Sequence, residues 1–188
     1  MSAPRKSPSI TTRVGDRGRT RLFSGEVVSK DSPRTAAYGD LDELVSLLGV
    51  ARSHARRREV RGRILRLQKD LFVVGSELAT DRKACGKLPR RVDAAMAAGL
   101  DKDCAGLEEG GKMPRDFIIP GASVAGSFID LARAVARRCE RNVVGLSRRG
   151  MVSNSHLIVW MNRLSDYLWL LARFEEKRST PLRRGKSR

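Results

Sequence analysis

Five segments with apolar residues at helical spacing constrain the fold of this chain more than any other feature. Between residues 34 and 58, apolar side chains recur every three or four positions, as on the buried face of an amphipathic helix. The same spacing appears in the segments 60–80, 91–109, 123–146 and 155–177, and it is weakest in 91–109. We therefore expect five helices, each of which buries one face.

The segments between these helices carry residues that end helices. Residues 81–90 and 110–121 both contain glycine and proline, and residues 9–33 lack helical periodicity and predict an ordered loop or a short extended piece. Strand signals are nearly absent, because aromatic residues make up only 5% of the chain. The pattern predicts an all-α fold, a five-helix antiparallel bundle that follows an ordered N-terminal loop.

The length of 188 residues suits one domain. We expect a single helical domain at 9–176, between a disordered N-terminus at 1–8 and a disordered basic tail at 177–188. No apolar run is long enough to span a membrane, and the first residues lack the apolar centre of a secretory signal. The cysteines form no CxxC pair, which predicts reduced thiols in the cytoplasm. They are Cys85, Cys104 and Cys139.

Charge narrows the classes of ligand. The chain has 38 Lys and Arg against 21 Asp and Glu, a net charge of +17. Such a field attracts nucleic acids, nucleotides and phosphorylated substrates, but a solubilising surface with basic ends has the same composition. Seven arginines in the stretch 52–66 favour a nucleic-acid-binding surface, although no recognition motif or stacking aromatic accompanies them. They are Arg52, Arg56, Arg57, Arg58, Arg61, Arg63 and Arg66.

A loop of glycines, hydroxyls and basic residues lies near the N-terminus. The sequence TRVGDRGRTRLFSG begins at Thr12 and continues to Lys30 and Asp31. Glycines let the backbone approach a ligand closely, while threonine hydroxyls and a lysine supply donors for phosphate oxygens. The composition therefore fits a phosphate-binding loop, and it equally fits a basic surface loop.

A ladder of arginines follows the fourth predicted helix. Arg133, Arg137 and Arg141 are spaced i, i+4 and i+8, so they project from one side, with Arg138 and Glu140 beside them. Like charges at this spacing repel unless an anion or carboxylate lies between them. Planar guanidinium groups suit a polyphosphate, whereas a solvated basic helix face is the alternative.

Polar residues also interrupt apolar helix faces. Asn162 and Asp166 lie one turn apart on the fifth predicted helix, where they fit either a hydrogen bond between helices or a contact to a ligand. Asp42, early in the first predicted helix, either favours the helix dipole or orients an active-site arginine. The stretch 106–113 approaches the Walker A spacing, but Met113 replaces the magnesium-binding Ser or Thr. His54 and His156 are isolated, so we expect no protein metal site.

Taken together, these blocks resemble one enzyme family. The segments TRVGDRGRTRLFSGEVVSKD, RTAAYGDLDEL, FIIPGASVAGSFIDLARAVARRCERNVV and MNRLSDYLWLLAR are similar, in order and spacing, to those of PduO-type ATP:cob(I)alamin adenosyltransferases. The resemblance runs from about residue 11 to residue 175. It implies a ferritin-like five-helix bundle that assembles as a homotrimer, with a nucleotide-binding N-terminal loop and active sites between subunits.

The resemblance also implies an activity. The enzyme would transfer the 5′-deoxyadenosyl group of ATP to cob(I)alamin, giving adenosylcobalamin and tripolyphosphate, with Mg²⁺ held by the ATP phosphates. A reductase and an adenosylcobalamin-dependent enzyme are the implied partners, and membranes and nucleic acids are not. A nucleic-acid-binding protein and an ATP-binding regulator without turnover remain the alternatives.

The resemblance implies the following site residues. Arg133, Arg137 and Asp42 would be catalytic, with Arg133 paired to Asp42. Phe117 and Asp166 would lie on the corrinoid side, where Phe117 helps to displace the lower axial ligand. The ATP-binding residues would be Thr12, Arg13, Val14, Gly15, Thr20, Arg21, Lys30, Arg137, Arg138, Cys139, Glu140, Arg141 and Asn162.

The sequence departs from the family pattern at several positions. The family often has glycine at Ala122, histidine at Asp130 and threonine at Ala134, and alanine is common at Cys139. Asp130 matters most, because it is expected to add a negative charge near the corrinoid.

Overall fold

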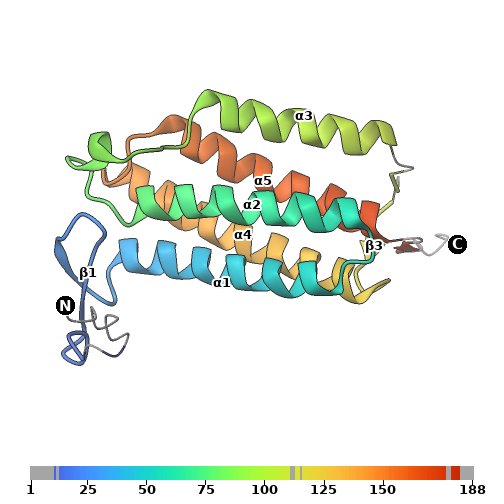
Figure 1. The fold of residues 1–188 in the computed structure, drawn as a ribbon. Coiled ribbons are helices and arrows are strands. Elements are labelled where there is room, and N and C mark those ends of the chain that lie inside the picture. Colours follow the sequence, from blue (N-terminus) through green and yellow to red (C-terminus); the bar gives the residue numbers. More distant parts are fainter. Residues whose placement is uncertain (1–10, 12, 111–112, 115, 177–178, 183–188) are drawn as a thin grey trace, which may run out of the picture.

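The protein folds as a bundle of long helices, as shown in a computed structural model (Figure 1). The structure describes residues 11, 13–110, 113–114, 116–176 and 179–182. Within them the helices are α1 (Pro33–His54), α2 (Arg58–Leu78), α3 (Ala94–Gly110), α4 (Val124–Arg148) and α5 (Ser155–Glu175), together with a 3-10 turn at Cys85–Lys87. The predicted all-α five-helix bundle is therefore confirmed. No helix in the described part of the chain combines the length and apolarity that crossing a bilayer needs.

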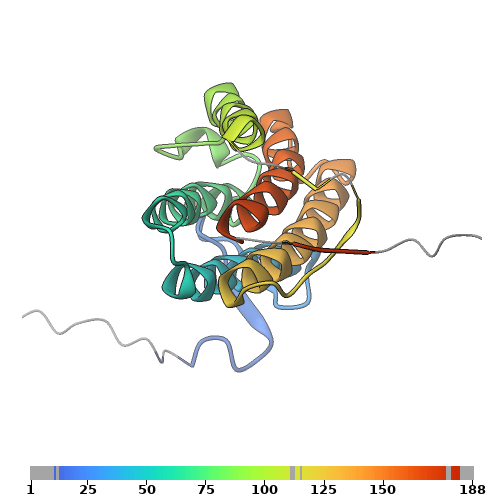
Figure 2. The same ribbon diagram turned by 90° about the vertical axis from the view of Figure 1, so that its right-hand side faces the viewer.

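The order of the helices in space differs from their order in the chain. α1 packs against both α2 and α4, and α5 packs between α4 and α3. Seen along the bundle axis, α3 lies at the periphery beside α5 (Figure 2). Only one face of α3 is buried, through Ala97, Leu100, Cys104 and Leu107, which fits this position.

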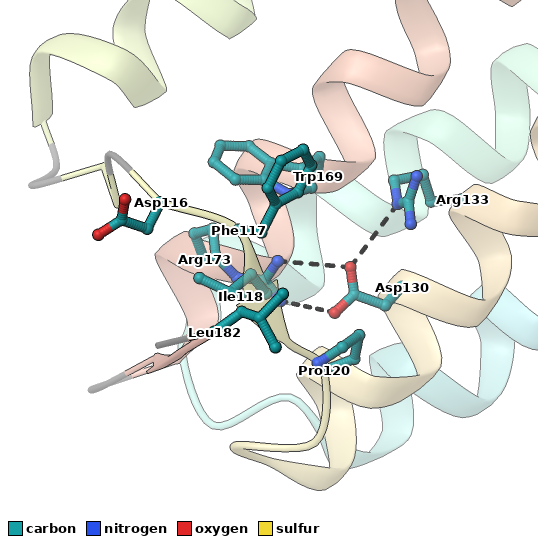
Figure 3. A pocket seen from close by; sticks show the side chains of 9 residues that line it. All are labelled: Asp116, Phe117, Ile118, Pro120, Asp130, Arg133, Trp169, Arg173 and Leu182. Carbon is teal, nitrogen blue, oxygen red and sulfur yellow. Dashed lines mark hydrogen bonds and ion pairs between the residues drawn. The ribbon is translucent and has the colours of Figure 1, made fainter. Parts of the chain in front are cut away.

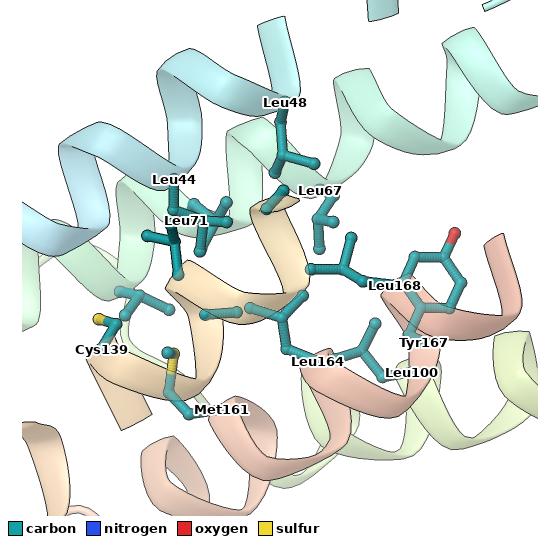
Figure 4. Packing of buried hydrophobic residues seen from close by; sticks show 14 of the residues in the cluster. Leu44, Leu48, Leu67, Leu71, Leu100, Cys139, Met161, Leu164, Tyr167 and Leu168 are labelled. Carbon is teal, nitrogen blue, oxygen red and sulfur yellow. The ribbon is translucent and has the colours of Figure 1, made fainter. Parts of the chain in front are cut away.

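The apolar stripes predicted from the sequence meet in one core. Leu44 and Leu48 of α1 face Leu67 of α2, and Leu164 and Leu168 of α5 pack against them (Figure 4). These side chains are almost completely removed from water. Truncating one such leucine to alanine costs about 2–5 kcal/mol of folding free energy, so this core holds the surfaces that carry the candidate site.

Side chains cap the helices that lead into the site. The hydroxyl of Ser32 accepts a hydrogen bond from the backbone N–H of Thr35 at 3.2 Å, and Pro33 begins α1. The hydroxyl of Ser123 accepts from the N–H of Gly126 at 3.0 Å and begins α4 in the same way. These caps fix where α1 begins after the N-terminal loop and where α4, the helix with the arginine ladder, begins after β3.

The first predicted helix ends earlier than expected. The sequence predicts helix to residue 58, but α1 ends at His54 and α2 begins at Arg58. The connection contains neither Gly nor Pro, so helical periodicity alone does not locate it. The carboxylate of Glu175 on α5 stabilises the turn, because it accepts the backbone N–H groups of Arg56 at 2.7 Å and Arg57 at 3.4 Å.

Two short antiparallel ribbons lie at the ends of the bundle. β1 (Arg19–Arg21) pairs with β2 (Val27–Ser29), and β3 (Ile118–Ile119) pairs with β4 (Thr180–Pro181). The second ribbon extends regular structure past residue 176, where the sequence analysis ended the domain. Strands of two or three residues are too short to leave a periodic signal in the sequence.

Candidate active site

The N-terminal loop folds back on itself. The backbone N–H of Gly18 donates to the carbonyl of Gly15 at 3.2 Å, and the N–H of Lys30 donates to the carbonyl of Gly18 at 2.9 Å. Gly18 has a φ of 72°, a left-handed conformation that glycine adopts without strain. Arg13 also has a positive φ, of 57°. The loop is therefore a compact turn rather than an extended arm.

This turn places the Lys30 ammonium directly against Gly15. A Cβ atom built on Gly15 would lie 2.8 Å from Lys30 Nζ and 3.0 Å from Lys30 Cε. A side chain at position 15 would force the end of Lys30 to move away from this place. The structure thus brings together two predicted ATP-binding residues, a bare backbone and a positive charge, which is the combination that holds phosphate oxygens.

The other predicted loop residues differ in how they are engaged. Thr12 lies outside the described residues. Arg13 and Val14 are exposed, and Thr20 is half-buried in β1, opposite Val28. Arg21 donates through Nη1 to the carbonyl of Gly25 at 2.8 Å, so part of its guanidinium is already used within the hairpin.

The loop is anchored to the bundle beside it. Leu22 is buried, and the N–H of Phe23 donates to the carbonyl of Ala79 at 2.8 Å. Below the loop, the buried guanidinium of Arg34 donates to the carbonyls of Leu78, Thr80 and Met151 at 2.8–2.9 Å. Because Arg34 satisfies carbonyls from two separate chain segments, the end of α2 and the turn before α5, it holds the base of the loop in a fixed position.

The arginine ladder of α4 divides into free and paired members. Arg137 and Arg141 are exposed, and no ion pair engages them among the described residues. Arg138 instead donates through Nε to Asp40 of α1 at 3.0 Å and also pairs with Glu43. Arg137 and Arg141 are therefore the ladder members available to an anion.

Cys139 and Glu140 complete the predicted nucleotide set on α4. The thiol of Cys139 is buried against the carbonyl of Ala37, at 3.5 Å, and burial raises its pKa to about 12. Its side chain belongs to the core and is not available to a nucleotide. Glu140 is half-buried.

The predicted residues of α5 and α1 lie on separate surfaces. Asn162 and Asp166 are exposed on α5, and Asp166 pairs with Arg163 at 3.0 Å. Asp42 is exposed on α1, where it borders an apolar cleft next to Phe72. Within the subunit Asp42 has no contact with Arg133, so the expected pair is not formed inside one chain.

A cavity of about 460 Å³ lies around Phe117 (Figure 3). The Phe117 side chain is 75% exposed, and Trp169 of α5 and Leu182 form apolar walls beside it. The N–H of Leu182 donates to the carbonyl of Phe117 at 2.7 Å, which braces the loop that carries the ring. Asp166 is not among the residues that line this cavity.

Charged groups form one side of the same cavity. Asp130 of α4 accepts hydrogen bonds from Arg173 of α5 at 2.6 and 3.5 Å, and Arg173 also donates to Glu176 at 2.9 Å. Burial works against the charged form of Arg173, but these two carboxylates outweigh it and raise its pKa. Nε of Arg133 lies 3.8 Å from Oδ1 of Asp130, so within the subunit Arg133 pairs with Asp130 and not with Asp42. The charge of Asp130 is thus compensated, which corrects the expectation of an added negative charge.

The loop and the cavity lie at opposite ends of the bundle (Figure 1). The β1–β2 hairpin stands where α1 begins, whereas β3 and the start of α4 stand at the far end. α4 contains 25 residues, so the bundle is about 37 Å long. Within one subunit the loop and the cavity are therefore separated by about the length of the bundle.

Sequence reasoning missed several residues that build these surfaces. Asp40 is one, since it accepts from both Arg138 and Asn142. Trp169, Arg173 and Glu176 are others. The sequence did contain one sign of this cluster: Arg173 is a charged residue in the apolar stretch of α5, and Glu176 follows three residues later, at the spacing of an ion pair on a helix.

The basic stretch 52–66 is less free than its composition suggests. Arg63 and Arg66 pair with Asp103 at 3.2 and 2.6 Å, and the Arg57 guanidinium lies 4.6 Å from the centre of the Phe174 ring. The described residues also contain no cluster of His, Cys, Asp or Glu side chains that could hold a metal ion.

The helical bundle carries a glycine–lysine loop at one end and a cavity lined by aromatic and arginine side chains at the other. The sequence profile of the cobalamin adenosyltransferase family matches residues 10–175. This chain belongs to that family, which confirms the resemblance found in the sequence.

Individual relatives agree with this assignment. The chain is 38% identical to a corrinoid adenosyltransferase of Citrobacter freundii, over 89% of this chain and 94% of the relative. It is 34% identical to a corrinoid adenosyltransferase of Bacillus subtilis, over 90% and 88%. A variant PduO-type ATP:corrinoid adenosyltransferase from Lactobacillus reuteri, solved with cobalamin and ATP, superposes with a TM-score of 0.84 at 28% identity, over 94% of this chain and 100% of that one.

Proposed function

We propose that this chain transfers the 5′-deoxyadenosyl group of ATP to cob(I)alamin, releasing tripolyphosphate, in active sites that form between the subunits of a homotrimer. Membership of the cobalamin adenosyltransferase family supports the reaction. The single structural observation that carries the proposal is the loop in which the Lys30 ammonium lies against the bare backbone of Gly15.

The reaction needs positioning and charge stabilisation more than proton transfer. The cobalt of cob(I)alamin is a strong nucleophile, and it attacks the 5′ carbon of the ribose while the bond from that carbon to the triphosphate oxygen breaks. Negative charge then develops on the leaving tripolyphosphate. Lys30 in the loop and the exposed guanidinium groups of Arg137 and Arg141 are the cations that we propose to stabilise this charge.

Magnesium fits this arrangement as an ion carried by the nucleotide. The phosphate oxygens of ATP are the hard ligands that Mg²⁺ prefers, so no dedicated set of carboxylates is required. The protein residues would bind the phosphate oxygens that the ion leaves free. Lys30 is the residue of the loop best placed for this role.

The trimer is supported by the separation of the two candidate substrate sites. The loop and the Phe117 cavity lie at opposite ends of one subunit, which supports a transfer from ATP on one chain to the corrinoid of a neighbour (Figure 1). Mixing an inactive Lys30→Ala protein with an inactive Arg137→Ala protein tests this arrangement. Some mixed trimers contain one site with both residues intact, so activity should return. Two variants that stay inactive when mixed would contradict shared sites.

Phe117 is proposed to contact the corrinoid. Its ring is exposed into the cavity rather than packed in the core. An apolar ring at the cobalt face would displace a polar lower ligand, and cob(II)alamin without that ligand is easier to reduce.

The cytoplasmic location predicted from the cysteines stays a prediction, as do the reductase and the adenosylcobalamin-dependent enzyme as partners.

The activity is tested with purified protein, ATP, Mg²⁺ and chemically reduced cobalamin. The absorbance spectrum should change to that of adenosylcobalamin only when ATP is present. Lys30→Ala should abolish the change, whereas Lys83→Ala, a lysine exposed on the loop after α2, should leave it unaffected. ATP binding without any adenosylcobalamin would instead identify a regulator.

A further inference from the structure

A second cleft, of about 680 Å³, lies between α2 and α3 and reaches down to α5. We call it the α2–α3 cleft. α3 packs on α5, and the cleft separates it from α2. The most buried residues of the lining are Leu67, Leu100 and Tyr167, which form the base. None of the described residues proposed to bind ATP or the corrinoid lines this cleft, so it is separate from the candidate active site.

The hydroxyl of Tyr167 is the polar group at the base of the cleft. Tyr167 is 1% exposed, and its hydroxyl makes no hydrogen bond of ordinary geometry among the described residues. The hydroxyl points away from the leucines of the core (Figure 4). Burial raises the pKa of Tyr167 although Arg63 acts to lower it, so the hydroxyl keeps its proton at neutral pH. It is therefore a buried donor that lacks an acceptor, and such groups are rare in folded proteins.

Basic side chains outnumber acidic ones in the cleft. Five basic residues and three aspartates line it within the described part of the chain. Glu59, which pairs with Arg63 at 2.8 Å from outside the lining, still leaves one positive charge in excess. The field in the cleft therefore favours an anion. The lining charges are those of Arg63, Arg66, Lys69, Asp70, Arg90, Asp93, Lys102 and Asp103.

Aspartates of the α3 wall already have donors of their own. Asp103 accepts hydrogen bonds from Arg63 at 3.2 Å and from Arg66 at 2.6 Å. Asp93 accepts the backbone N–H of Met96 at 2.8 Å, at the start of α3. These carboxylates are therefore satisfied without the lysines of the cleft.

Two lysines remain for a ligand, one on each wall. Among the described residues, no ion pair or hydrogen bond engages the ammonium groups of Lys69 on α2 and Lys102 on α3. Asp70, which follows Lys69 in the chain, lies 3.5 Å from Arg90 instead. Gly99 leaves the α3 wall open, because a Cβ atom there would meet nothing within 4 Å. The cleft therefore offers both unpaired cations and space.

The kind of anion follows from these donors and from the apolar base. A phosphate group has several acceptor oxygens and up to two negative charges, which suits a hydroxyl donor together with ammonium groups on both walls. A carboxylate has only two oxygens and one charge. Leu67 and Leu100 would cover an organic body next to the phosphate, and the volume is typical of small-molecule sites.

We propose that the α2–α3 cleft binds a small organic phosphate, with the Tyr167 hydroxyl and the ammonium groups of Lys69 and Lys102 as donors to the phosphate oxygens. The site lies apart from the Lys30 loop and from the Phe117 cavity. The inference therefore goes beyond the proposed function and does not depend on it.

The test uses phenyl phosphate as the probe and acetylation of each lysine by N-hydroxysuccinimide acetate as the readout, quantified by peptide mass spectrometry. At constant ionic strength, phenyl phosphate should slow the acetylation of Lys69 and Lys102 several-fold, with saturation. Lys83, which is exposed outside this cleft, should react at an unchanged rate. Because the readout is local, phosphate bound at Lys30 does not contribute to it.

Variants separate a ligand contact from a structural role. Tyr167→Phe keeps the ring and removes the hydroxyl, so the probe concentration that half-protects Lys102 should rise about tenfold. Lys102→Gln should do the same for the protection of Lys69, whereas Lys83→Gln, the matched control, should change nothing. Without the probe, Tyr167→Phe should melt at or above the wild-type temperature, because the lost hydroxyl has no partner. A lower melting temperature with unchanged protection would mean a structural hydroxyl and would overturn the proposal.

Other outcomes would also overturn it. Equal slowing at Lys83 would mean general screening of charge, and the absence of saturable protection would mean a cleft that holds only water. Protection by benzoate at the same concentration would contradict the choice of phosphate, and equal protection by inorganic phosphate would contradict the organic body. If Tyr167→Phe does not fold, Lys102→Gln, at an exposed position, decides the question. The test involves neither ATP nor cobalamin, so failure of the proposed adenosyl transfer would leave its result unaffected.

Discussion

Replacing Gly15 with alanine is expected to impair ATP use without weakening the fold. The added methyl group would lie 2.8 Å from Lys30 Nζ, whereas ordinary contacts between such atoms are 3.5–4.0 Å. The ammonium must therefore retreat by roughly 0.7 Å. A misplacement of about 1 Å can cost a hundredfold in rate, so we expect kcat/KM for ATP to fall about tenfold or more.

The stability of the variant should be unchanged or slightly higher. The φ angle of Gly15 is not in the positive range, and alanine reduces the freedom of the unfolded chain, which is worth about 0.4–1 kcal/mol. Steady-state kinetics against ATP and thermal melts with and without ATP measure both effects. Gly62→Ala, on an open face of α2, is the control and should leave activity unchanged. Wild-type kinetics for Gly15→Ala would refute the assignment of Lys30 to the phosphates.

Three further predictions follow from the site and the core. Arg137→Lys should lower kcat/KM for ATP nearly as much as Arg137→Ala, about tenfold to hundredfold, because lysine lacks the planar guanidinium that binds two phosphate oxygens. In the same kinetic assay Arg61→Lys, the control, should have no effect. Phe117→Ala should slow the reaction that starts from cob(II)alamin more than the reaction that starts from cob(I)alamin. Because Phe117 is exposed, its loss should barely change the melting temperature. Leu164 is buried, so Leu164→Ala should lower the free energy of unfolding by about 2–5 kcal/mol in a denaturant titration. The pKa of Cys139 is raised to about 12, so the folded state holds this proton more tightly than the unfolded state, and the free energy of unfolding should fall as pH rises from about 9 to 12. Cys139→Ala should reduce that dependence, and equal slopes for both proteins would contradict the cause.

Much of the fold could be predicted from the sequence, because helical periodicity reports burial directly. The leucines of α1, α2 and α5 that set the expected stripes are the ones that meet in the core. The α1–α2 turn could not be located, since Glu175, more than a hundred residues away, stabilises it. The β3–β4 ribbon was missed because it pairs Ile118 with Pro181, far away in the sequence, and no local pattern reports such a pairing. The β1–β2 hairpin is local and lies in the segment 9–33, where an ordered loop or a short extended piece was predicted.

The candidate site was predictable in its parts but not in its pairings. The glycines and Lys30 were recognisable as a candidate phosphate loop, with a basic surface loop as the alternative, and the ladder on α4 was visible from its spacing. The sequence does not say that Arg138 is already paired with Asp40, nor that Asp130 is neutralised by Arg173, 43 residues later. Such pairings depend on which helices become neighbours, and that follows only from the tertiary fold.

The central claim is the transfer of an adenosyl group with tripolyphosphate as the other product. The most direct measurement is a single-turnover reaction with limiting ATP and excess cob(I)alamin, in which adenosylcobalamin and tripolyphosphate are both quantified. Attack at the 5′ carbon predicts that the two products form in equal amounts and at the same rate. Release of orthophosphate or pyrophosphate in place of tripolyphosphate, or consumption of ATP without adenosylcobalamin, would contradict the proposed reaction.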